Sequence, residues 1–488
     1  MPFPPPSRPF RIRLPRLMPC AAVLAAAAAL GACTVTEPYV PPVADPVQTA
    51  PFDAAPQAGV MSGAPVDHWW RLYDDPVLDA LIQEALAQNR DLAVAAARVQ
   101  RVRAALAEAD AAQLPATQAA AGVDYGKHGP DQTVAAARDE RAASRFGWSP
   151  GFAVSWEVDL WGRVRGLVDA AHADAQAQRA AADAMRVTVA AETARAYALA
   201  CAFGQRVEVA QRSLGVAERI AALIARQQAL GLVSALEQAR AQAFADDTRA
   251  ALPALEGERR AALYELATLT GHAPAQVPAA AKQCHVAPAL AQPFPVGDGA
   301  ALLRRRPDLR EAERRLAAAH AREDVARASL YPAITFGGSV NALSTSGDPG
   351  SIGDRHAVAW GIGPLVSWDF PNLAASRARL GQARADADGA RAAFDGQVLR
   401  ALRETEQALV RYEAAWQGRD ALRAARDAHA RALSLAEREF RAGALDSLGV
   451  LDAERGLVAV EANLAESAQR VALDQVAVFK ALGGGWQP

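Results

Sequence analysis

The chain has 488 residues, with 52 Lys and Arg residues against 54 Asp and Glu residues, so its formal net charge is -2. This balance excludes a nucleic-acid-binding protein, in which we expect a strongly basic domain. The abundance of alanine, the strongest helix former, favours long helices over compact α/β domains. The Cys and His residues show no metal-ligand spacing, so the sequence predicts no metal site and no cofactor.

The amino terminus is typical of a secretory signal peptide over residues 1–32. Several arginines precede an apolar run of about ten residues, which is too short to span a bilayer as a helix. The run ends in Leu30-Gly31-Ala32-Cys33, which resembles the lipobox of bacterial lipoproteins, where cleavage before the cysteine frees it for acylation. The alternative is an ordinary signal peptide with an incidental cysteine nearby. Residues 33–66 are rich in proline and show no helical or strand period, so we expect a lipidated tether and a folded part that begins near Trp69.

The rest of the chain contains two copies of one pattern. Several residues of the first copy recur in the second at one constant offset: Asp91-Leu92 as Asp308-Leu309, Arg98 as Arg315, and Pro115 as Pro332. The copies also close alike, with Leu269-Thr270-Gly271 and Leu482-Gly483-Gly484. We therefore predict a first repeat over residues 67–271, a linker over residues 272–299 at the equator of the helical part, and a second repeat over residues 300–488.

Each repeat is predicted to contain a helix, a β-hairpin and a long helical hairpin. In the first repeat, a helix from about 75 to 113 ends before Pro115, which cannot continue it. Residues 151–160 then alternate between apolar and small or polar side chains, which is a strand period. We expect hairpins at about 116–161 and about 332–369, with strands of roughly ten residues, the length of a membrane-spanning strand. The alternative is a soluble sheet of half-buried strands.

The long helices and the small number of strands together predict an oligomer. No proline occurs from about 163 to 229, so this segment predicts a helix about 100 Å long. Apolar residues after Pro371 step by seven positions, which is typical of a coiled coil. Four strands cannot close a barrel in a bilayer, whereas three chains supply about twelve.

The predicted fold class is therefore mainly α with a small membrane β part. It is internally duplicated, with long coiled-coil helices that form an α-barrel and four β-strands per protomer of a 12-stranded trimeric β-barrel.

Four dispersed segments carry more specific sequence motifs. They are, in chain order, Trp69-Trp70-Arg71-Leu72-Tyr73-Asp74-Asp75-Pro76, Trp156-Glu157-Val158-Asp159-Leu160-Trp161-Gly162, Leu303-Arg304-Arg305-Arg306-Pro307-Asp308 and Val450-Leu451-Asp452-Ala453-Glu454-Arg455. In this order they resemble the TolC-like outer membrane factor family, in its lipoprotein branch of NodT type from resistance-nodulation-division (RND) efflux systems. The resemblance spans roughly residues 69–486.

The resemblance implies a homotrimer in outer membrane lipid, with a large periplasmic portion and a lipid anchor. Such a channel passively conducts small molecules to the exterior, receiving them from a periplasmic adaptor (membrane fusion) protein and an RND inner-membrane pump. The alternative is a lipid-anchored periplasmic coiled-coil scaffold without channel activity. Under both interpretations the chain is not an enzyme. We expect Glu157, Asp159 and Asp369 to lie in the lumen or at the base of the barrel. Asp159 and Asp369 occupy like positions in the two repeats, which a catalytic carboxylate pair would not need.

The turns that join the long helices are predicted to form the periplasmic tips. Gly231 and Gly443 can take the left-handed conformation that ends a helix, and Ser234 and Asp446 can cap the helix that follows. Turn chemistry alone explains the choice of these four residues. The resemblance adds that such tips are the docking sites for the adaptor.

Three residues of the last helix are candidates for a channel gate. Leu448, Asp452 and Arg455 are spaced by four and three positions, which places them on one helical face just inside the tip. The resemblance implies that matching positions form a hydrophobic ring and an ion-pair network that close the channel at rest. A solvated ion pair of little energetic value is the alternative. Gly449 stands where some relatives carry a second acidic residue, which puts a two-ring acidic constriction in doubt.

Two cysteines remain after the signal peptide is removed and Cys33 is acylated. Cys201 and Cys284 then lie in an oxidising compartment, where a disulfide between them is one expectation. The other is a pair of buried, unpaired thiols that behave as small apolar side chains.

Overall fold

The computed structural model describes residues 38–43, 45–54, 60–61, 63–290, 293–344 and 346–485. The predicted signal peptide and Cys33 lie outside these ranges. The chain divides into two compact units: Met1–Val40, Ala104–Ala173 and Ala317–Gly389 form one, and Pro41–Arg103, Asp174–Leu316 and Ala390–Pro488 form the other. Among the described helices, none combines the length and apolar character required to cross a membrane.

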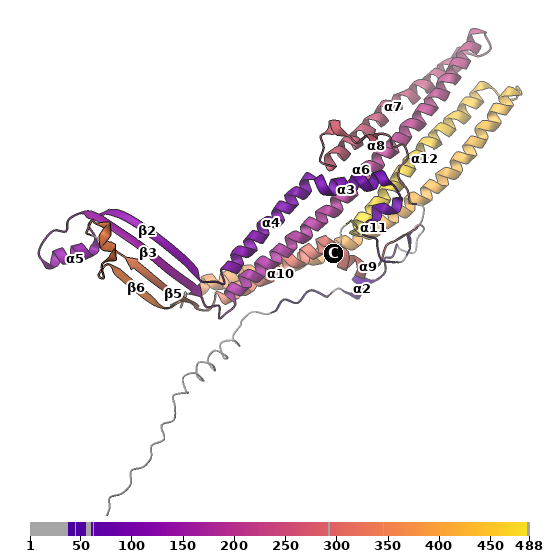
Figure 1. Cartoon of the computed structure of the whole chain (residues 1–488). Helices are drawn as coiled ribbons and strands as arrows, with labels where there is room; N and C mark the ends of the chain where they lie inside the picture. The colour runs from indigo at the N-terminus through magenta and orange to yellow at the C-terminus, as the bar shows by residue number, and fades with distance from the viewer. Residues whose placement is uncertain are drawn as a thin grey trace, which may run out of the picture. The chain divides into compact units, whose positions relative to one another are not determined.

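The first unit is built around a four-stranded antiparallel sheet with the order β2-β3-β5-β6 (Figure 1). Its strands are β2 (Ala116–Gly126), β3 (Arg145–Glu157), β5 (Ala333–Ala342) and β6 (Val358–Ser367). Each repeat supplies one hairpin, and the two hairpins join through β3 and β5. The loops carry a short helix, α5 (Gly129–Ala137), and a 3-10 turn, η3 (Pro349–Gly353), which the sequence reasoning did not predict.

The register gives the sheet one apolar face and one face of small and polar side chains. Phe152, Val340 and Trp360 form one cross-strand row, and the adjacent row contains Ala153, Ser339 and Gly361. The predicted alternation of Phe152, Val154 and Trp156 is therefore confirmed. The predicted strand limits are wrong at both ends, because β3 begins at Arg145 and stops at Glu157. In the described sheet, the outer edges of β2 and β6 have no partner strand.

Three tryptophans fasten the ends of β3 and β6 to the backbone just before β2 and β5. The indole N–H groups of Trp156, Trp161 and Trp368 donate hydrogen bonds to the backbone oxygens of Gln113, Pro332 and Leu330, respectively. Buried or half-buried indoles commonly satisfy their N–H in this way. These bonds tie the ends of β3 and β6 to the backbone at the start of β2 and β5.

The two carboxylates at the end of the first hairpin have structural partners. Glu157 accepts a hydrogen bond from Arg163 Nε at 2.8 Å. Asp159 accepts the backbone N–H groups of Val164 and Arg165 at 2.9 Å each and so caps the following helix. Both side chains therefore organise the transition from strand to helix.

Helices of very different lengths make up most of the described chain (Figure 1). They are α3 (Pro76–Gln88), α4 (Arg90–Ala111), α6 (Arg163–Ala229), α7 (Ala235–Leu269), α9 (Gly299–Arg305), α10 (Pro307–Ala328), α11 (Ala374–Arg441) and α12 (Ser447–Ala481). The limits of α6 agree with the prediction from the proline-free segment. The single helix expected from about 75 to 113 is wrong, because α3 and α4 are separate helices that meet at Asn89.

The core of the second unit packs aromatic side chains around the ends of its helices. Trp69, Trp70, Phe294 and Phe479 are at most 2% exposed, and the ring of Trp69 stacks on that of Phe479 at 4.7 Å. Trp69 and Trp70 belong to the short 3-10 segment η1 (Trp69–Tyr73). Burying aromatic side chains of this size contributes a large share of the core energy.

The expectation that folded structure begins near Trp69 is wrong. Short elements precede it, namely α2 (Pro46–Thr49) and β1 (Val60–Met61), and β1 pairs in parallel with β4 (Phe294–Pro295). Phe52 is 4% exposed and belongs to the main core. The carboxylate of Glu406 accepts the N–H groups of Asp53 and Ala54, which satisfies a backbone that has no helical or strand partner.

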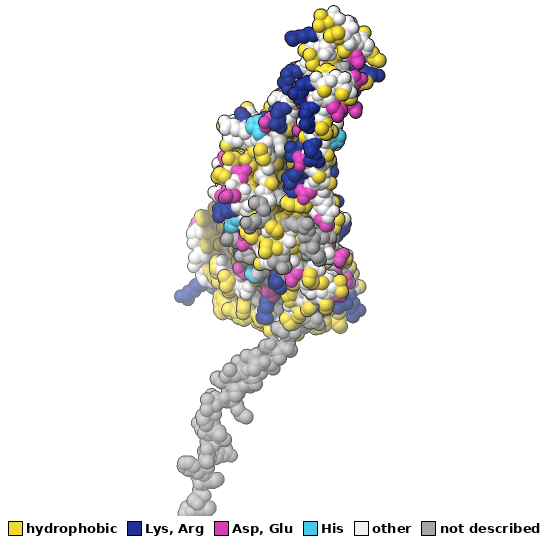
Figure 2. Space-filling view, turned by 90° about the vertical axis from the view of Figure 1, so that its right-hand side faces the viewer, with side chains coloured by type: hydrophobic (Ala, Val, Ile, Leu, Met, Phe, Trp, Pro, Cys, Tyr) yellow, Lys and Arg dark blue, Asp and Glu magenta, His cyan; other side chains and the backbone are white. Residues whose placement is uncertain are grey.

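Basic and acidic side chains are interspersed on the face of the molecule seen in Figure 2. Many of them form pairs between or within helices, for example Arg249 with Glu218 at 2.8 Å. This distribution agrees with the near-zero net charge of the sequence and presents no large basic field of the kind that nucleic acids require.

Candidate gate and helix tips

The turn between α6 and α7 has the geometry predicted from its sequence. Gly231 has a φ of +73°, the left-handed conformation that ends α6. Ser234 caps α7 in a capping box, because its hydroxyl accepts the N–H of Glu237 and the carboxylate of Glu237 accepts the N–H of Ser234. These contacts occupy the polar groups of the turn.

The first tip also presents a cluster of exposed leucines that the sequence reasoning missed. Leu230, Leu232 and Leu236 are 75%, 70% and 59% exposed within the single chain. Three large apolar side chains on one turn form a surface suited to contact with another protein. The turn signals around Gly231 concern backbone conformation and carry no information about the exposure of these side chains.

The turn between α11 and α12 repeats the same design with one difference. Gly443 has a φ of +75° and ends α11, and Asp446 accepts the N–H of Gly449 at 2.9 Å and caps α12. Gly449 stands where the first tip has Glu237, so this cap lacks the reciprocal carboxylate. A side chain at position 449 would collide with Leu445, since its Cβ would lie 2.6 Å from that residue. The predicted caps are thus confirmed at both turns.

The three predicted gate residues lie along the first turns of α12, but they do not interact with one another. Leu448 is half-buried and Asp452 is exposed. Arg455 points to α7, where its guanidinium lies 5.1 Å from the centre of the Phe244 ring and donates to the backbone oxygen of Arg240 at 3.3 Å. No ion pair joins Asp452 to Arg455 in the part of the chain that the structure describes. An ion-pair network at this face therefore requires partners from another chain.

A small apolar core holds α12 against α6 and α7 behind these residues. Leu451, at 2% exposure, packs with Ala217 and Ile224 of α6 and with Ala241 and Phe244 of α7. The burial of Leu451 fixes the rotation of α12 about its own axis. The neighbouring residue Asp452 is therefore on a side of α12 that is exposed in the single chain. The position of the candidate gate face thus follows from apolar packing.

A buried polar side chain stands at the break between the first two helices of each repeat. Asn89 separates α3 from α4, accepts the N–H groups of Asp91 and Leu92, and donates through Nδ2 to the backbone oxygen of Leu269. Arg306 separates α9 from α10 and donates through Nη1 to the backbone oxygen of Ala481. Leu269 and Ala481 are the last residues of α7 and α12. Each repeat therefore closes on itself at the same point through a different side chain.

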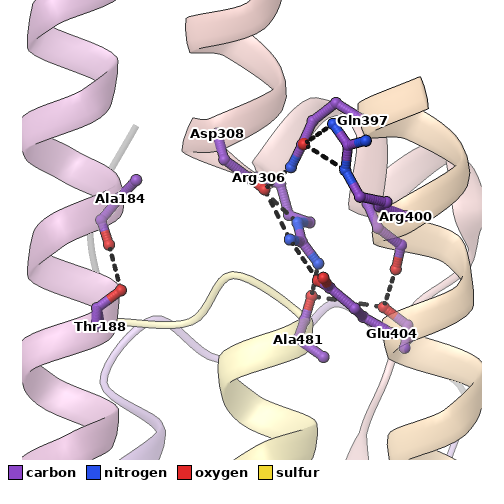
Figure 3. Close-up of polar contacts among 10 residues, drawn as sticks. Ala184, Thr188, Arg306, Asp308, Gln397, Arg400, Glu404 and Ala481 are labelled. Atoms are coloured by element: carbon purple, nitrogen blue, oxygen red, sulfur yellow. Dashed lines mark hydrogen bonds and ion pairs between the residues drawn. The ribbon is translucent and has the colours of Figure 1, made fainter. Parts of the chain in front are cut away.

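The Arg306 cluster is the more extensive of the two contacts (Figure 3). Arg306 is 8% exposed and binds both carboxylate oxygens of Asp308, at 3.0 and 2.7 Å, and Glu404 of α11 at 2.9 Å. Burial alone would raise the pKa of Asp308, but the hydrogen bonds and charge of Arg306 and the amide of Gln397 outweigh it, so that this pKa is lowered. The cluster joins α10, α11 and the end of α12.

The structure joins Cys201 and Cys284 in a disulfide. Cys201 is fully buried in α6, and Cys284 lies in the segment between α8 (Ala279–Lys282) and β4. Arg259 of α7 donates to the backbone oxygens of Lys282 and Cys284, at 2.6 and 3.3 Å. The bond therefore fastens a segment that has little secondary structure of its own to α6.

We expect the Cys201→Ala and Cys284→Ala double variant to lose about 2–5 kcal/mol of stability, the usual contribution of a disulfide that closes a long loop. Thermal unfolding of purified protein, compared with and without reductant, measures this effect. Reductant should lower the melting temperature of the wild type and leave that of the variant unchanged. A wild type that is indifferent to reductant would show that the two thiols are not bonded.

Comparison with known proteins shows what this fold is. The sequence profile of the outer membrane efflux proteins matches residues 81–272 and 300–484, one stretch in each half of the chain. The pyoverdine export outer membrane protein OpmQ of Pseudomonas putida is 33% identical over 445 residues, covering 89% of this chain and 91% of OpmQ. Outer membrane protein OprJ of Pseudomonas aeruginosa is 31% identical over 462 residues, covering 94% of each chain. The structure of the outer-membrane channel OprN aligns with a TM-score of 0.85 at 33% identity, covering 93% of this chain and 100% of OprN.

A duplicated chain of this kind, with one hairpin and one long helix pair in each half, defines the TolC-like class of outer membrane channels. Within that class, the chain belongs to the outer membrane efflux protein family. It is an outer membrane protein, and its relatives are efflux channels rather than enzymes.

Proposed function

We propose that this chain is the outer membrane channel component of a tripartite efflux system, and that it passively conducts small molecules to the exterior. The observation that carries the proposal is the four-stranded sheet. One face is apolar, the other bears small and polar side chains, and both edges lack a partner strand in the described chain. This is the expected form of a barrel segment with one face toward lipid and the other toward water.

The unpaired edges support a homotrimer. The outer edges of β2 and β6 leave N–H and C=O groups without partners, which is costly in hydrocarbon. Pairing β6 of one copy with β2 of the next satisfies both edges at once, and three copies give about twelve strands. The long helices attached to each hairpin then continue the wall on the periplasmic side.

The tips support partnership with a periplasmic adaptor and, through it, with an RND inner-membrane pump. We assign docking to the two turns that contain Gly231, Ser234, Gly443 and Asp446, together with the exposed leucines of the first turn. The polar groups of both turns are internally bonded, so apolar contact rather than free charge provides the affinity. Transport is driven by the pump, and no residue of this chain is assigned a catalytic role.

The amino-terminal segment supports acylation of Cys33 as a second membrane attachment. Tyr39 packs on Ala173, Ala317 and Ala318, and its ring lies 5.9 Å from that of His320 on α10. The chain between Cys33 and Tyr39 reaches at most about 20 Å. Ala318 lies about 15 Å along α10 from the end of that helix, which precedes β5. Acyl chains on Cys33 can therefore reach the layer that contains the strands.

We assign the gate to Leu448, Asp452 and Arg455. Threefold symmetry repeats each of them into a ring, and Asp452 of one chain then has Arg455 of another as its available partner. Each such pair contributes up to about 1 kcal/mol. Three pairs therefore favour the closed state by up to about 3 kcal/mol.

Single-channel recording in planar bilayers tests both the duct and the gate. We expect the purified protein to conduct ions with low open probability, and Asp452→Ala and Arg455→Ala to raise that probability markedly. Glu439→Ala, which removes an exposed carboxylate of α11 near the same tip, is the matched control and should behave as the wild type. Absence of conductance in every form would support the coiled-coil scaffold. Conductance that is unaffected by the first two substitutions would remove Asp452 and Arg455 from the gate.

A further inference from the structure

A cavity of about 610 Å³ lies between α6, α11 and α12 near the tip. Its walls are partly apolar, with Ile220 from α6, Phe440 from α11 and Leu457 from α12 among them. Three arginines and three glutamates also line it: Arg212 and Arg219 from α6, Arg441 and Glu437 from α11, and Glu454 and Glu461 from α12. The cavity is thus a place where a change of charge acts on the packing of three helices.

Glu454 differs from the other charged residues of this cavity. It is 6% exposed, and in the described structure it makes no hydrogen bond and no ion pair. A buried carboxylate without a partner is costly when it is ionised, and proteins commonly avoid the cost by keeping it protonated. Burial accordingly raises the pKa of Glu454, the charges of Glu437 and Glu461 raise it further, and Arg219 offsets only part of the increase.

Elsewhere along the contact between α6 and α12, acidic side chains are paired with basic ones. Lys480 of α12 binds Glu192 of α6 at 2.8 Å, and Glu466 of α12 lies 3.7 Å from Arg206 of α6. The two helices therefore exchange opposite charges farther from the tip. Glu454 lies three residues after Leu451 of the apolar core. There the ion pairs between the two helices give way to a buried carboxylate.

We propose that Glu454 is a proton-operated switch of the gate. In the protonated form it allows α12 to pack against α6 and α11. Its ionisation, repelled by Glu437 of α11, drives α12 out of this packing. The face that carries Asp452 and Arg455, which lie two residues before and one residue after Glu454, is loosened as a result. The proposal rests on the assignment of that face as the gate.

The direction of the pH effect follows from the environment of Glu454. Because its pKa is higher in the packed state than in water, packing of α12 is fully favoured below the ordinary carboxyl value of 4.5 and is lost as pH rises through the raised pKa. Between those two values, the ratio of loosened to packed forms rises about tenfold for each pH unit. Acid therefore favours the closed tip, and a rise in pH above 4.5 weakens that preference.

One other titratable side chain of α11 contacts α12 close to this cavity. A Cβ at Gly456 would lie 2.8 Å from Nδ1 of His429, so the imidazole rests directly on the α12 backbone. The experiment therefore includes His429→Gln as a separate arm.

The test is open probability in planar bilayers between pH 4.5 and 8 for four forms of the full-length protein. We expect the wild type to open progressively as pH rises and Glu454→Gln to stay near the low-pH level throughout, because glutamine keeps the size of the acid and cannot ionise. Glu439→Gln, which removes an exposed carboxylate of α11, and His429→Gln should retain the wild-type profile. A wild type without pH dependence, an unchanged profile in Glu454→Gln, or a flat profile in His429→Gln would each overturn the proposal.

Hydrogen exchange provides a readout that does not depend on the gate assignment. Between pH 4.5 and the raised pKa of Glu454, peptides from residues 448–461 of the wild type should exchange faster as pH rises, by up to about tenfold per pH unit beyond the intrinsic pH dependence, and those of Glu454→Gln should follow the intrinsic rate alone. If Asp452→Ala leaves conductance unchanged while this difference persists, the gate assignment fails and the proton switch stands. If exchange of the two proteins is identical, the switch fails whatever the gate variants do.

Discussion

Replacing Ile362 with arginine should abolish assembly of the protein in the outer membrane. Ile362 lies in the middle of β6, on the face that carries Val340, Trp360 and Pro364, and it is 69% exposed in the single chain. A charged side chain on the lipid face near the bilayer midplane costs about 2–4 kcal/mol in a membrane strand. In a trimer this cost is repeated three times, about 6–12 kcal/mol in total, which exceeds the margin of most assemblies.

The same strand provides a closely matched control. Leu365 is 67% exposed, nearly the same as Ile362, but the register pairs it with Thr335 on the face of small and polar side chains. Leu365→Arg should therefore assemble as the wild type does, because its guanidinium points toward water in the lumen. The amount of trimer in isolated outer membranes, measured by native gel electrophoresis, distinguishes the two variants. Equal trimer levels for both would mean that neither face of the sheet contacts lipid.

The sheet also shows which parts of the fold the sequence determines locally. The alternation of Phe152, Val154 and Trp156 predicted a strand and its faces correctly, because burial on one side imposes a period of two. β3 begins earlier than the alternation indicates, and Pro150, a residue type that is rare in central strands, lies in this added part. The N–H of Trp148 bonds to Ser344 on the β5 side, so position 150 also faces β5. The regular ladder with β5 begins at Gly151, so the missing N–H of proline falls in the gap between this ladder and the isolated Trp148–Ser344 pair.

The helical part was predicted where local signals suffice and missed where distant segments meet. A proline-free, alanine-rich segment gave the limits of α6, and glycine with a capping residue gave both tip turns. The constant offset that relates Asp91 to Asp308 also relates Asn89 to Arg306, yet the shared role of this second pair was not predicted. An amide and a guanidinium are dissimilar in sequence, and their common task is to reach the end of a helix far away in the chain.

The candidate gate shows the same limit. A spacing of four and three correctly placed Leu448, Asp452 and Arg455 along one stretch of α12, because helical geometry is local. The partner of Arg455 is the ring of Phe244 on α7, which no local pattern identifies. The burial of Glu454 was likewise not predicted, since its cavity is formed by three helices from distant parts of the sequence.

Replacing Arg306 with methionine should lower the free energy of unfolding by about 3–5 kcal/mol, the usual cost of removing one partner from a buried ion pair. Methionine fills much of the space of the arginine side chain but leaves Asp308 without its bidentate partner and the backbone oxygen of Ala481 without its donor. Urea unfolding followed by circular dichroism measures the change. Arg304→Met, which removes the exposed arginine two positions earlier, is the matched control and should change stability by less than about 0.5 kcal/mol.

The pH dependence of this loss of stability distinguishes two causes: a buried carboxylate left without its partner, and a loss of packing volume. In the wild type the lowered pKa of Asp308 means that its stabilising contribution is present at neutral pH and is lost only as pH falls below the ordinary value of 3.8. In Arg306→Met, burial dominates and raises the pKa of Asp308, so the variant should regain stability as pH falls through that raised pKa toward 3.8, while the wild type does not. Adding Asp308→Asn should recover part of the loss at pH 7, because the buried site then holds no charge without a partner. If the variant's deficit is constant with pH and the second substitution recovers nothing, Arg306 acts through volume alone.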